Sequence, residues 1–270
     1  MKRQLATAFA MVAIGVGSGI QCASAQSADA DVCVGSGPQT PRDINDKRGS
    51  NNLPVPAKPV AELNLCNIHF HANAEHKSTD KKLGFWQVAE KGQNGFQCSG
   101  DMAKKKLTPA ELKDPGHGAC HEIKPGDTIE VHWVYTSCNS APGEGLATCV
   151  ACKDHILRVE AQTFIVVNNN KAMNFTNFAY AGQKNGKHQV NALPAGTGTP
   201  VVFAGSTTGP DYTQKVCSPE KVTWSVRPQC AKVDINSLNK WCATDKFVKD
   251  HEPHGARPLV TSVKLLAPIP

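Results

Sequence analysis

The sequence predicts a mainly β (α+β) fold, built on a central twisted, largely antiparallel sheet with few short helices. Short runs rich in Val, Ile, Phe and Trp recur along the 270 residues, as is typical of strands. Turn-forming clusters such as "KPGD" (124–127) and "AGTGTP" (195–200) separate these runs. No long linker or internal repeat divides the sequence, which predicts one sizeable domain over residues 26–270.

Residues 1–25 are interpreted as a signal peptide. Lys2 and Arg3 precede the apolar run "LATAFAMVAIGVG", and small residues follow, ending in "ASAQ" with cleavage expected after Ala25. The apolar run is shorter than the roughly 20 residues that a membrane span needs. The sequence therefore predicts a periplasmic or secreted protein without stable membrane insertion.

The cysteine count supports export. Loss of Cys22 with the signal peptide leaves ten cysteines, and an even number in an exported chain predicts up to five disulfides whose pairing stays open. The motif "CVAC" (149–152) is also compatible with a redox or zinc pair, but no second C-x-x-C accompanies it. We therefore expect structural disulfides there.

The charge distribution argues against nucleic-acid binding. The formal net charge of +6 falls to +4 without Lys2 and Arg3, and apart from "KKK" (104–106) the lysines are scattered. Scattered charge of this kind is typical of a solvated surface rather than of a phosphate-binding stripe.

The elements follow in a simple order. After an extended arm (26–62), five strands are predicted at 63–71, 127–136, 157–168, 199–205 and 221–228. Residues 77–126 form a long polar insertion between the first two strands. Short helices are expected at 108–114, opened by Thr108, and at 234–242, opened by Asp234.

Three histidines on the first two strands form a candidate metal site. Residues two apart in a strand share a face, so His69 pairs with His71, and His132 lies on one face with Glu130. Histidines in strands are often ordinary core residues, but the two motifs together favour a metal. Three histidines with an open fourth position are the ligand set of catalytic zinc, and Glu130 can accept the second N–H of a ligand histidine.

A rival interpretation is a cupin-type metal site. The segment "HFHANAE" also reads H-x-H-x-x-x-E, in which Glu75 would be a fourth ligand. The glycines expected on either side are absent, because Leu63 and Lys82 occupy those positions. The cupin interpretation stays a minor alternative.

The order of these motifs resembles the carbonic anhydrases. The motifs "HFH", "EH" and "E-x-H-W" are similar to those of the alpha class, and the amino-acid sequence around them is closer to the delta class. The resemblance spans nearly the whole mature chain, through "QTPRDI" (39–44), "GSTTGP" (205–210), "VTWSV" (222–226) and "ARPL" (256–259). It implies an alpha-carbonic-anhydrase-like fold.

The resemblance also implies residue roles at the metal. His69, His71 and His132 would bind Zn2+, and Glu130 would hold one of these ligands in place. His76 would be a structural histidine rather than a ligand.

Further roles are implied around the substrate. Glu75 would accept a hydrogen bond from a loop threonine that acts as a gatekeeper, which is Thr208 if the loop is aligned without a gap and Thr207 otherwise. Val134 would line the wall of the substrate pocket, and Trp224 would pack beneath it.

The implied activity is reversible hydration of carbon dioxide to bicarbonate and a proton, with no nucleic-acid partner. Two features differ from the alpha class: the insertion 77–126, and a proton shuttle that stays unassigned among His117, His121, His155, His188, His251 and His254. A catalytically silent binding module that kept the fold is the main alternative, although all three histidines are present.

Overall fold

The computed structural model describes most of the chain. The described residues are 33, 35–55, 58–79, 86–88, 94–209, 211–244 and 252–270. The predicted signal peptide and the first residues of the arm lie outside them. No helix among the described residues is long and apolar enough to cross a membrane.

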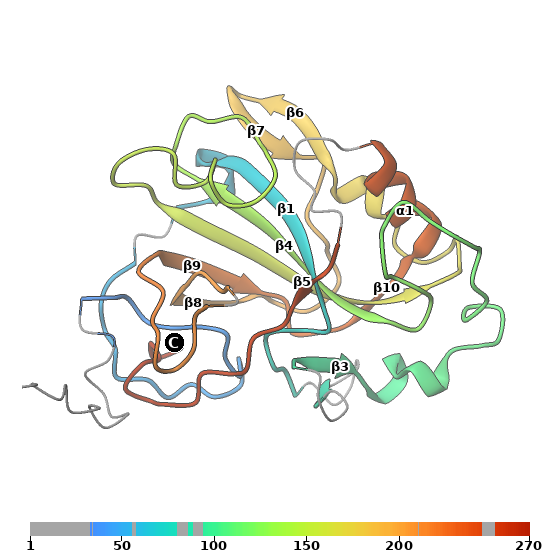
Figure 1. Ribbon diagram of the computed structural model, residues 1–270, viewed down its shortest axis with the longest axis horizontal. Helices are drawn as coiled ribbons and strands as arrows, with labels where there is room; N and C mark the ends of the chain where they lie inside the picture. The colour runs from blue at the N-terminus through green and yellow to red at the C-terminus, as the bar shows by residue number, and fades with distance from the viewer. Residues whose placement is uncertain are drawn as a thin grey trace, which may run out of the picture.

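A seven-stranded mixed sheet forms the centre of the molecule (Figure 1). Its order is β11-β1-β4-β5-β9-β8, with β10 paired to β5. The bounds are β1 (Asn64–Ala72), β4 (Thr128–Thr136), β5 (Leu157–Val167), β8 (Val201–Ser206), β9 (Lys221–Val226), β10 (Ala231–Asp234) and β11 (His254–Gly255). The pairs β1–β4, β4–β5 and β8–β9 are antiparallel, whereas β1–β11, β5–β9 and β5–β10 are parallel.

Smaller elements surround this sheet. Two hairpin-like pairs join β2 (Trp86–Val88) to β3 (Phe96–Cys98) and β6 (Tyr180–Lys184) to β7 (Lys187–Val190). One α-helix, α1 (Ile235–Thr244), is accompanied by 3-10 turns η1 (Val60–Glu62), η2 (Gly100–Met102), η3 (Lys104–Lys106) and η4 (Phe175–Phe178) within the described ranges. The prediction of a mainly β fold with few short helices is confirmed, and all five predicted strands are present.

The two predicted helices have different outcomes. The second is confirmed as α1, where the Asp234 carboxylate accepts a hydrogen bond from Ser237 N at 3.1 Å. The prediction at 108–114 is wrong, because these residues form a single turn. Thr108 and Glu111 do exchange the reciprocal bonds of a capping box. The helix does not continue because the proline at 115 disfavours helical geometry in the residue before it, and so short a helix is marginal.

The alternation of β1 and β4 divides their side chains between two faces. Ile68, Phe70 and Trp133 enter one apolar cluster, which also includes Trp241 of α1. The opposite face carries the histidines, beside a second apolar cluster that contains Trp224. The strand pattern thus places the candidate metal site on the face of the sheet away from α1.

Five disulfides connect the ten cysteines from Cys33 to Cys242. The pairs are Cys33–Cys217, Cys66–Cys149, Cys98–Cys230, Cys120–Cys242 and Cys138–Cys152. Structural disulfides at "CVAC" are confirmed, with its two cysteines bonded to different partners. Two of the pairs attach the insertion 77–126 to the body of the fold. Such a disulfide set fits a protein of an oxidising, extracytoplasmic compartment.

Candidate metal centre

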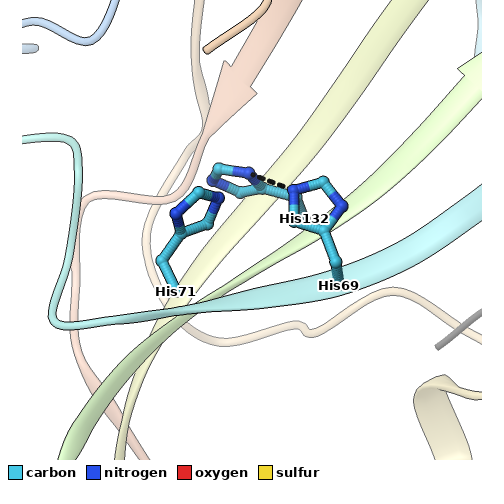
Figure 2. A group of neighbouring side chains, drawn as sticks. All are labelled: His69, His71 and His132. Atoms are coloured by element: carbon cyan, nitrogen blue, oxygen red, sulfur yellow. Dashed lines mark hydrogen bonds between the residues drawn. The ribbon is translucent and has the colours of Figure 1, made fainter. Parts of the chain in front are cut away.

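The antiparallel register of β1 and β4 brings the three histidines together. His69 lies opposite His132, and His71 lies opposite Glu130. All four side chains are on one face, because the partners are two residues apart in each strand. Each histidine is at most 6% exposed, and one ring nitrogen of each lies within 4.8 Å of the others (Figure 2).

The second nitrogen of each histidine faces an oxygen of the protein. The contacts are His69 Nδ1 to Asn67 Oδ1 at 2.5 Å, His71 Nδ1 to the Gly255 carbonyl at 3.4 Å, and His132 Nε2 to Glu130 Oε1 at 3.2 Å. Such contacts select the tautomer of each ring and leave the other nitrogen available to a metal.

The remaining nitrogens converge on one point. His132 Nδ1 faces His69 Nε2 at 3.2 Å, and His71 Nε2 is buried with no hydrogen-bond partner among the described residues. A buried nitrogen without a partner needs an explanation, and a metal ion that accepts its lone pair provides one. Three imidazole nitrogens are a ligand set that suits zinc, so the residues fit this ion.

Burial lowers the pKa of two of the three histidines. Burial, together with the neighbouring histidines, lowers the pKa of His69 well below its ordinary value. Burial also lowers the pKa of His71 to about 4, although Glu75 acts in the opposite direction. Burial raises the pKa of the Glu130 carboxyl, but His76 and His132 more than offset this and hold it well below the ordinary range. His69 and His71 are therefore uncharged at neutral pH, as metal ligands must be.

A second group of possible ligands shares one residue with the first. His76, Glu130 and His132 also place ligand atoms within 4.8 Å of one another. Here the carboxylate is already engaged: Glu130 Oε2 accepts from His76 N, and Glu130 Oε1 lies 2.9 Å from His76 Nδ1. The Trp224 ring packs against both imidazoles, at centroid distances of 4.5 Å and 5.0 Å. The carboxylate of this second group is therefore already engaged by the protein, although His76 Nε2, like His71 Nε2, is buried with no hydrogen-bond partner among the described residues.

Only one of the two carboxylate oxygens of Glu75 has a hydrogen-bond partner among the described residues. Its Oε1 accepts a hydrogen bond from Arg257 N at 2.9 Å and lies 3.5 Å from His71 Nδ1. Its Oε2 is buried and has no partner among the described residues. Glu75 belongs to neither group of possible metal ligands, contrary to what a cupin site would require.

A pocket of about 370 Å³ opens beside the histidines. Its lining includes Thr208 and Gly209 from the loop after β8, and His254 and Gly255 from β11. Thr207 does not line this pocket, since its hydroxyl lies 2.6 Å from Ser218 Oγ. The hydrogen bond from Thr208 to Glu75 that the resemblance implies is not formed in this structure, because Glu75 Oε2 is unpartnered in the described part of the chain.

The two predicted apolar residues lie behind the site. Val134 and Trp224 belong to one buried cluster, and neither is among the residues that line the pocket. Trp224 contacts the site through its ring on His132 and donates a hydrogen bond from Nε1 to the Ser206 carbonyl at 2.9 Å.

Of the histidines left open for proton transfer, His254 lies at the pocket. Its ring stacks on His69 at 4.9 Å and meets His71 edge-on at 5.3 Å. His155 and His188 contact Glu220 and Tyr180 instead. His117 and His121 line a separate hollow, and position 251 lies outside the described residues.

The contacts of Asn67, Gly255 and Arg257 were not predicted from the sequence, although Arg257 belongs to the "ARPL" segment (256–259) of the resemblance. Asn67 had a detectable signal, since it is two residues before His69 and so shares its strand face. The carbonyl of Gly255 and the backbone N–H of Arg257 had none, because they come from a distant segment and act through backbone atoms.

Replacing Asn67 by Leu is expected to weaken zinc affinity about 10- to 100-fold, as is usual when the hydrogen-bond partner of a ligand histidine is lost. Asn67→Asp is the matched control, because it keeps an oxygen for His69 Nδ1. Competition with a chelator of known affinity measures the difference. Equal affinity in Asn67→Leu and in the unchanged protein would show that this contact does not orient His69.

Comparisons with known proteins were made on both the structure and the sequence. One similar solved structure is the alpha-carbonic anhydrase of Photobacterium profundum, with 19% identity, 82% of this chain and 84% of that chain covered, and a TM-score of 0.28. Another is the alpha-carbonic anhydrase from Thermovibrio ammonificans in complex with the inhibitor sulfanilamide, with 16% identity, the same coverages and a TM-score of 0.27. A search of curated proteins gave no match. The family model described as "Delta carbonic anhydrase" matches residues 60–237, a range that includes all three histidines.

Proposed function

The chain belongs to the delta carbonic anhydrase family, and on that premise we propose that it is a zinc enzyme that interconverts carbon dioxide and bicarbonate. The observation that carries the proposal is the convergence of three buried histidines beside a pocket of about 370 Å³. A catalytically silent module would have no need of three ligand nitrogens grouped within 4.8 Å of one another beside a pocket.

His69, His71 and His132 would hold the metal. When bound, zinc acts as a Lewis acid that lowers the pKa of water to about 7, so that hydroxide is available at neutral pH. Burial keeps His69 and His71 uncharged. Asn67 orients His69, and Glu130 orients His132.

Thr208 and Glu75 would orient the attacking group. Glu75 Oε1 is occupied by Arg257 N, which leaves the buried Oε2 as an acceptor. We propose that the Thr208 hydroxyl donates to Oε2 during the reaction, so that its own oxygen can only accept. A hydroxyl fixed in this way selects one orientation of the nucleophile, which is the preorganisation that lowers activation barriers.

The surroundings suit a small, apolar substrate. Carbon dioxide carries no charge, and no carboxylate, lysine or arginine is among the described residues that line the pocket. The apolar residues Val134 and Trp224 pack behind this lining. The proton released on hydration would leave through the pocket, whose wall includes His254. No residue is assigned to carry it.

The place of action is proposed from two features. The disulfides fit an oxidising compartment, and the first 25 residues have the pattern of a cleaved signal peptide. We propose a periplasmic or secreted enzyme that forms one domain over residues 26–270, with 77–126 as an insertion.

Stopped-flow measurement of carbon dioxide hydration tests the proposed function. We expect the mature protein to lose activity when it is stripped with a chelator and to regain it on addition of about one zinc per chain. A zinc-loaded, folded protein that does not accelerate hydration would contradict the enzyme and favour the binding module.

A further inference from the structure

The loop that carries Thr208 is closed at its base. This loop, residues 207–218, connects β8 to the approach of β9. Thr207 Oγ1 lies 2.6 Å from Ser218 Oγ, and Thr207 N donates to the Glu220 carbonyl at 3.2 Å. These contacts fix the two ends of the loop, whereas Thr208 and Gly209 lie beyond them, at the pocket.

Tyr212 supports the part of the loop beside the pocket. Its N–H donates to the Gly209 carbonyl at 3.2 Å. Its ring also packs against Gly209, where an added Cβ would lie 3.3 Å from Tyr212 Cδ2. The position of this ring therefore constrains Gly209, and through it the neighbouring Thr208.

Arg257 in turn supports Tyr212. Its guanidinium lies 5.9 Å from the centroid of the Tyr212 ring. Arg257 is only 4% exposed, and its three side-chain nitrogens have no hydrogen-bond partner among the described residues. A buried charge is costly unless something compensates it, and an aromatic face within about 6 Å does so in part. The Tyr212 ring therefore stabilises the buried guanidinium of Arg257.

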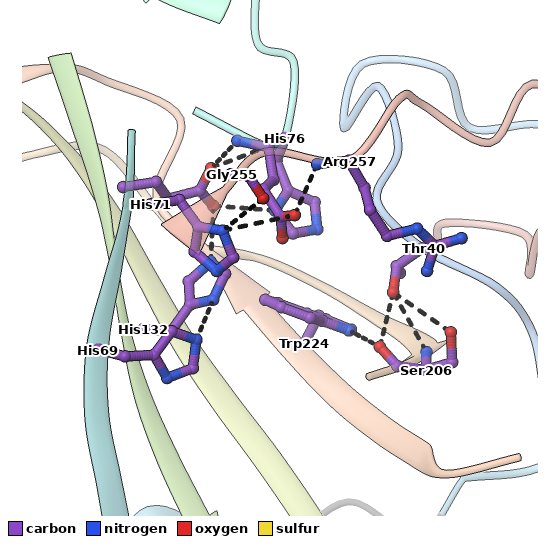
Figure 3. Close-up of polar contacts among 11 residues, drawn as sticks. Thr40, His69, His71, His76, His132, Ser206, Trp224, Gly255 and Arg257 are labelled. Carbon is purple, nitrogen blue, oxygen red and sulfur yellow. Dashed lines mark hydrogen bonds and ion pairs between the residues drawn. The ribbon is translucent and has the colours of Figure 1, made fainter. Parts of the chain in front are cut away.

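Arg257 also holds Glu75. Its backbone N–H donates to Glu75 Oε1 at 2.9 Å. Arg257 therefore contacts both the Glu75 carboxylate and the Tyr212 ring. Figure 3 shows the backbone nitrogen of Arg257 directed at the histidine cluster, while the side chain runs away from it.

We propose that Tyr212 is a positioning residue, whose ring, seated between Gly209 and the Arg257 guanidinium, holds the loop so that the Thr208 hydroxyl can reach the free oxygen of Glu75 during the reaction. The proposal rests on the proposed function and deepens it. Arg257 contacts both Glu75 and the Tyr212 ring, so this ring links the loop that carries Thr208 to the residue that holds Glu75.

Tyr212→Ala is expected to lower kcat/KM for carbon dioxide hydration about tenfold, a size usual for residues coupled by contact. Zinc content should not change, because Tyr212 contacts no proposed ligand. Tyr212→Phe keeps the aromatic face, so it should restore kcat/KM to about the original value. A Phe variant as slow as the Ala variant would overturn the proposal.

A double-mutant cycle separates positioning from a general structural role. If Tyr212 acts through Thr208, then Tyr212→Ala should cause no further loss once Thr208→Val is present. Losses that multiply in the double variant would show that the two residues act independently, which contradicts the proposal.

Hydrogen exchange gives a test that needs no activity. In metal-free protein, the amides of residues 205–218 should exchange faster in Tyr212→Ala than in the unchanged protein or in Tyr212→Phe. If the zinc-loaded protein fails to hydrate carbon dioxide, the proposed function is wrong. Hydrogen exchange alone then tests whether Tyr212 holds the loop that carries Thr208. Equal exchange in all three proteins overturns it.

Discussion

Replacing His71 by Ala is expected to remove zinc from the protein and to abolish carbon dioxide hydration, whereas replacing His76 by Asn should leave zinc bound. Two groups of possible metal ligands are present, and in each group the ligand atoms lie within 4.8 Å of one another. His132 belongs to both groups. A His132 variant would lose metal in either case, so only residues unique to one group can distinguish them. His71 Nε2 and His76 Nε2 are both buried without a hydrogen-bond partner among the described residues, but Glu130, which the second group would need as a ligand, is already bonded to His76 Nδ1.

Metal analysis of the purified variants after dialysis measures the outcome. The Asn side chain at position 76 can still donate to Glu130, so the variant should stay folded. His117→Ala, which removes an exposed histidine far from the cluster, controls for non-specific zinc. Zinc retained by His71→Ala but lost from His76→Asn would assign the metal to the other group.

Replacing Thr208 by Val is expected to slow carbon dioxide hydration about 10²-fold or more, the usual cost of losing a preorganised hydrogen bond at a reacting group. Val has nearly the shape of Thr but no hydroxyl, so Glu75 Oε2 would stay unpartnered and the nucleophile would be free to rotate. Zinc content should not change, because threonine is not a ligand. Stopped-flow kinetics and metal analysis on one preparation measure both quantities.

Two variants make this result specific. Thr208→Ser keeps the hydroxyl and should retain most of the rate. Thr207→Val removes the hydroxyl that contacts Ser218, so it tests the alternative alignment of the loop. If Thr207→Val were the slower variant and Thr208→Val had no effect, the gatekeeper would be Thr207.

The strand pattern was enough to predict the core of the site. Because side chains alternate in a strand, the spacing of His69, His71 and His132 predicted one shared face, and the register of β1 with β4 has this arrangement. The same rule could have identified Asn67. Local signals of this kind depend only on residues a few positions apart.

Contacts between distant segments could not be predicted in this way. The Gly255 carbonyl and the Arg257 N–H act through backbone atoms, so no side-chain pattern marks them. The parallel pairing of β5 with β9 and β10 depends on tertiary packing. The β6–β7 hairpin is different, because the sequence does carry a signal for it. Its turn has φ of 53° at Asn185 and 75° at Gly186, and an Asn-Gly pair is typical of such two-residue hairpin turns.

Anomalous diffraction at the zinc edge, from crystals of the zinc-loaded protein, tests the central claim most directly. We expect one strong peak bound by His69 Nε2, His71 Nε2 and His132 Nδ1 at about 2.0–2.1 Å, with a fourth position that no protein atom fills. A peak between His76, Glu130 and His132, or a Glu75 oxygen in the fourth position, would contradict the proposed site.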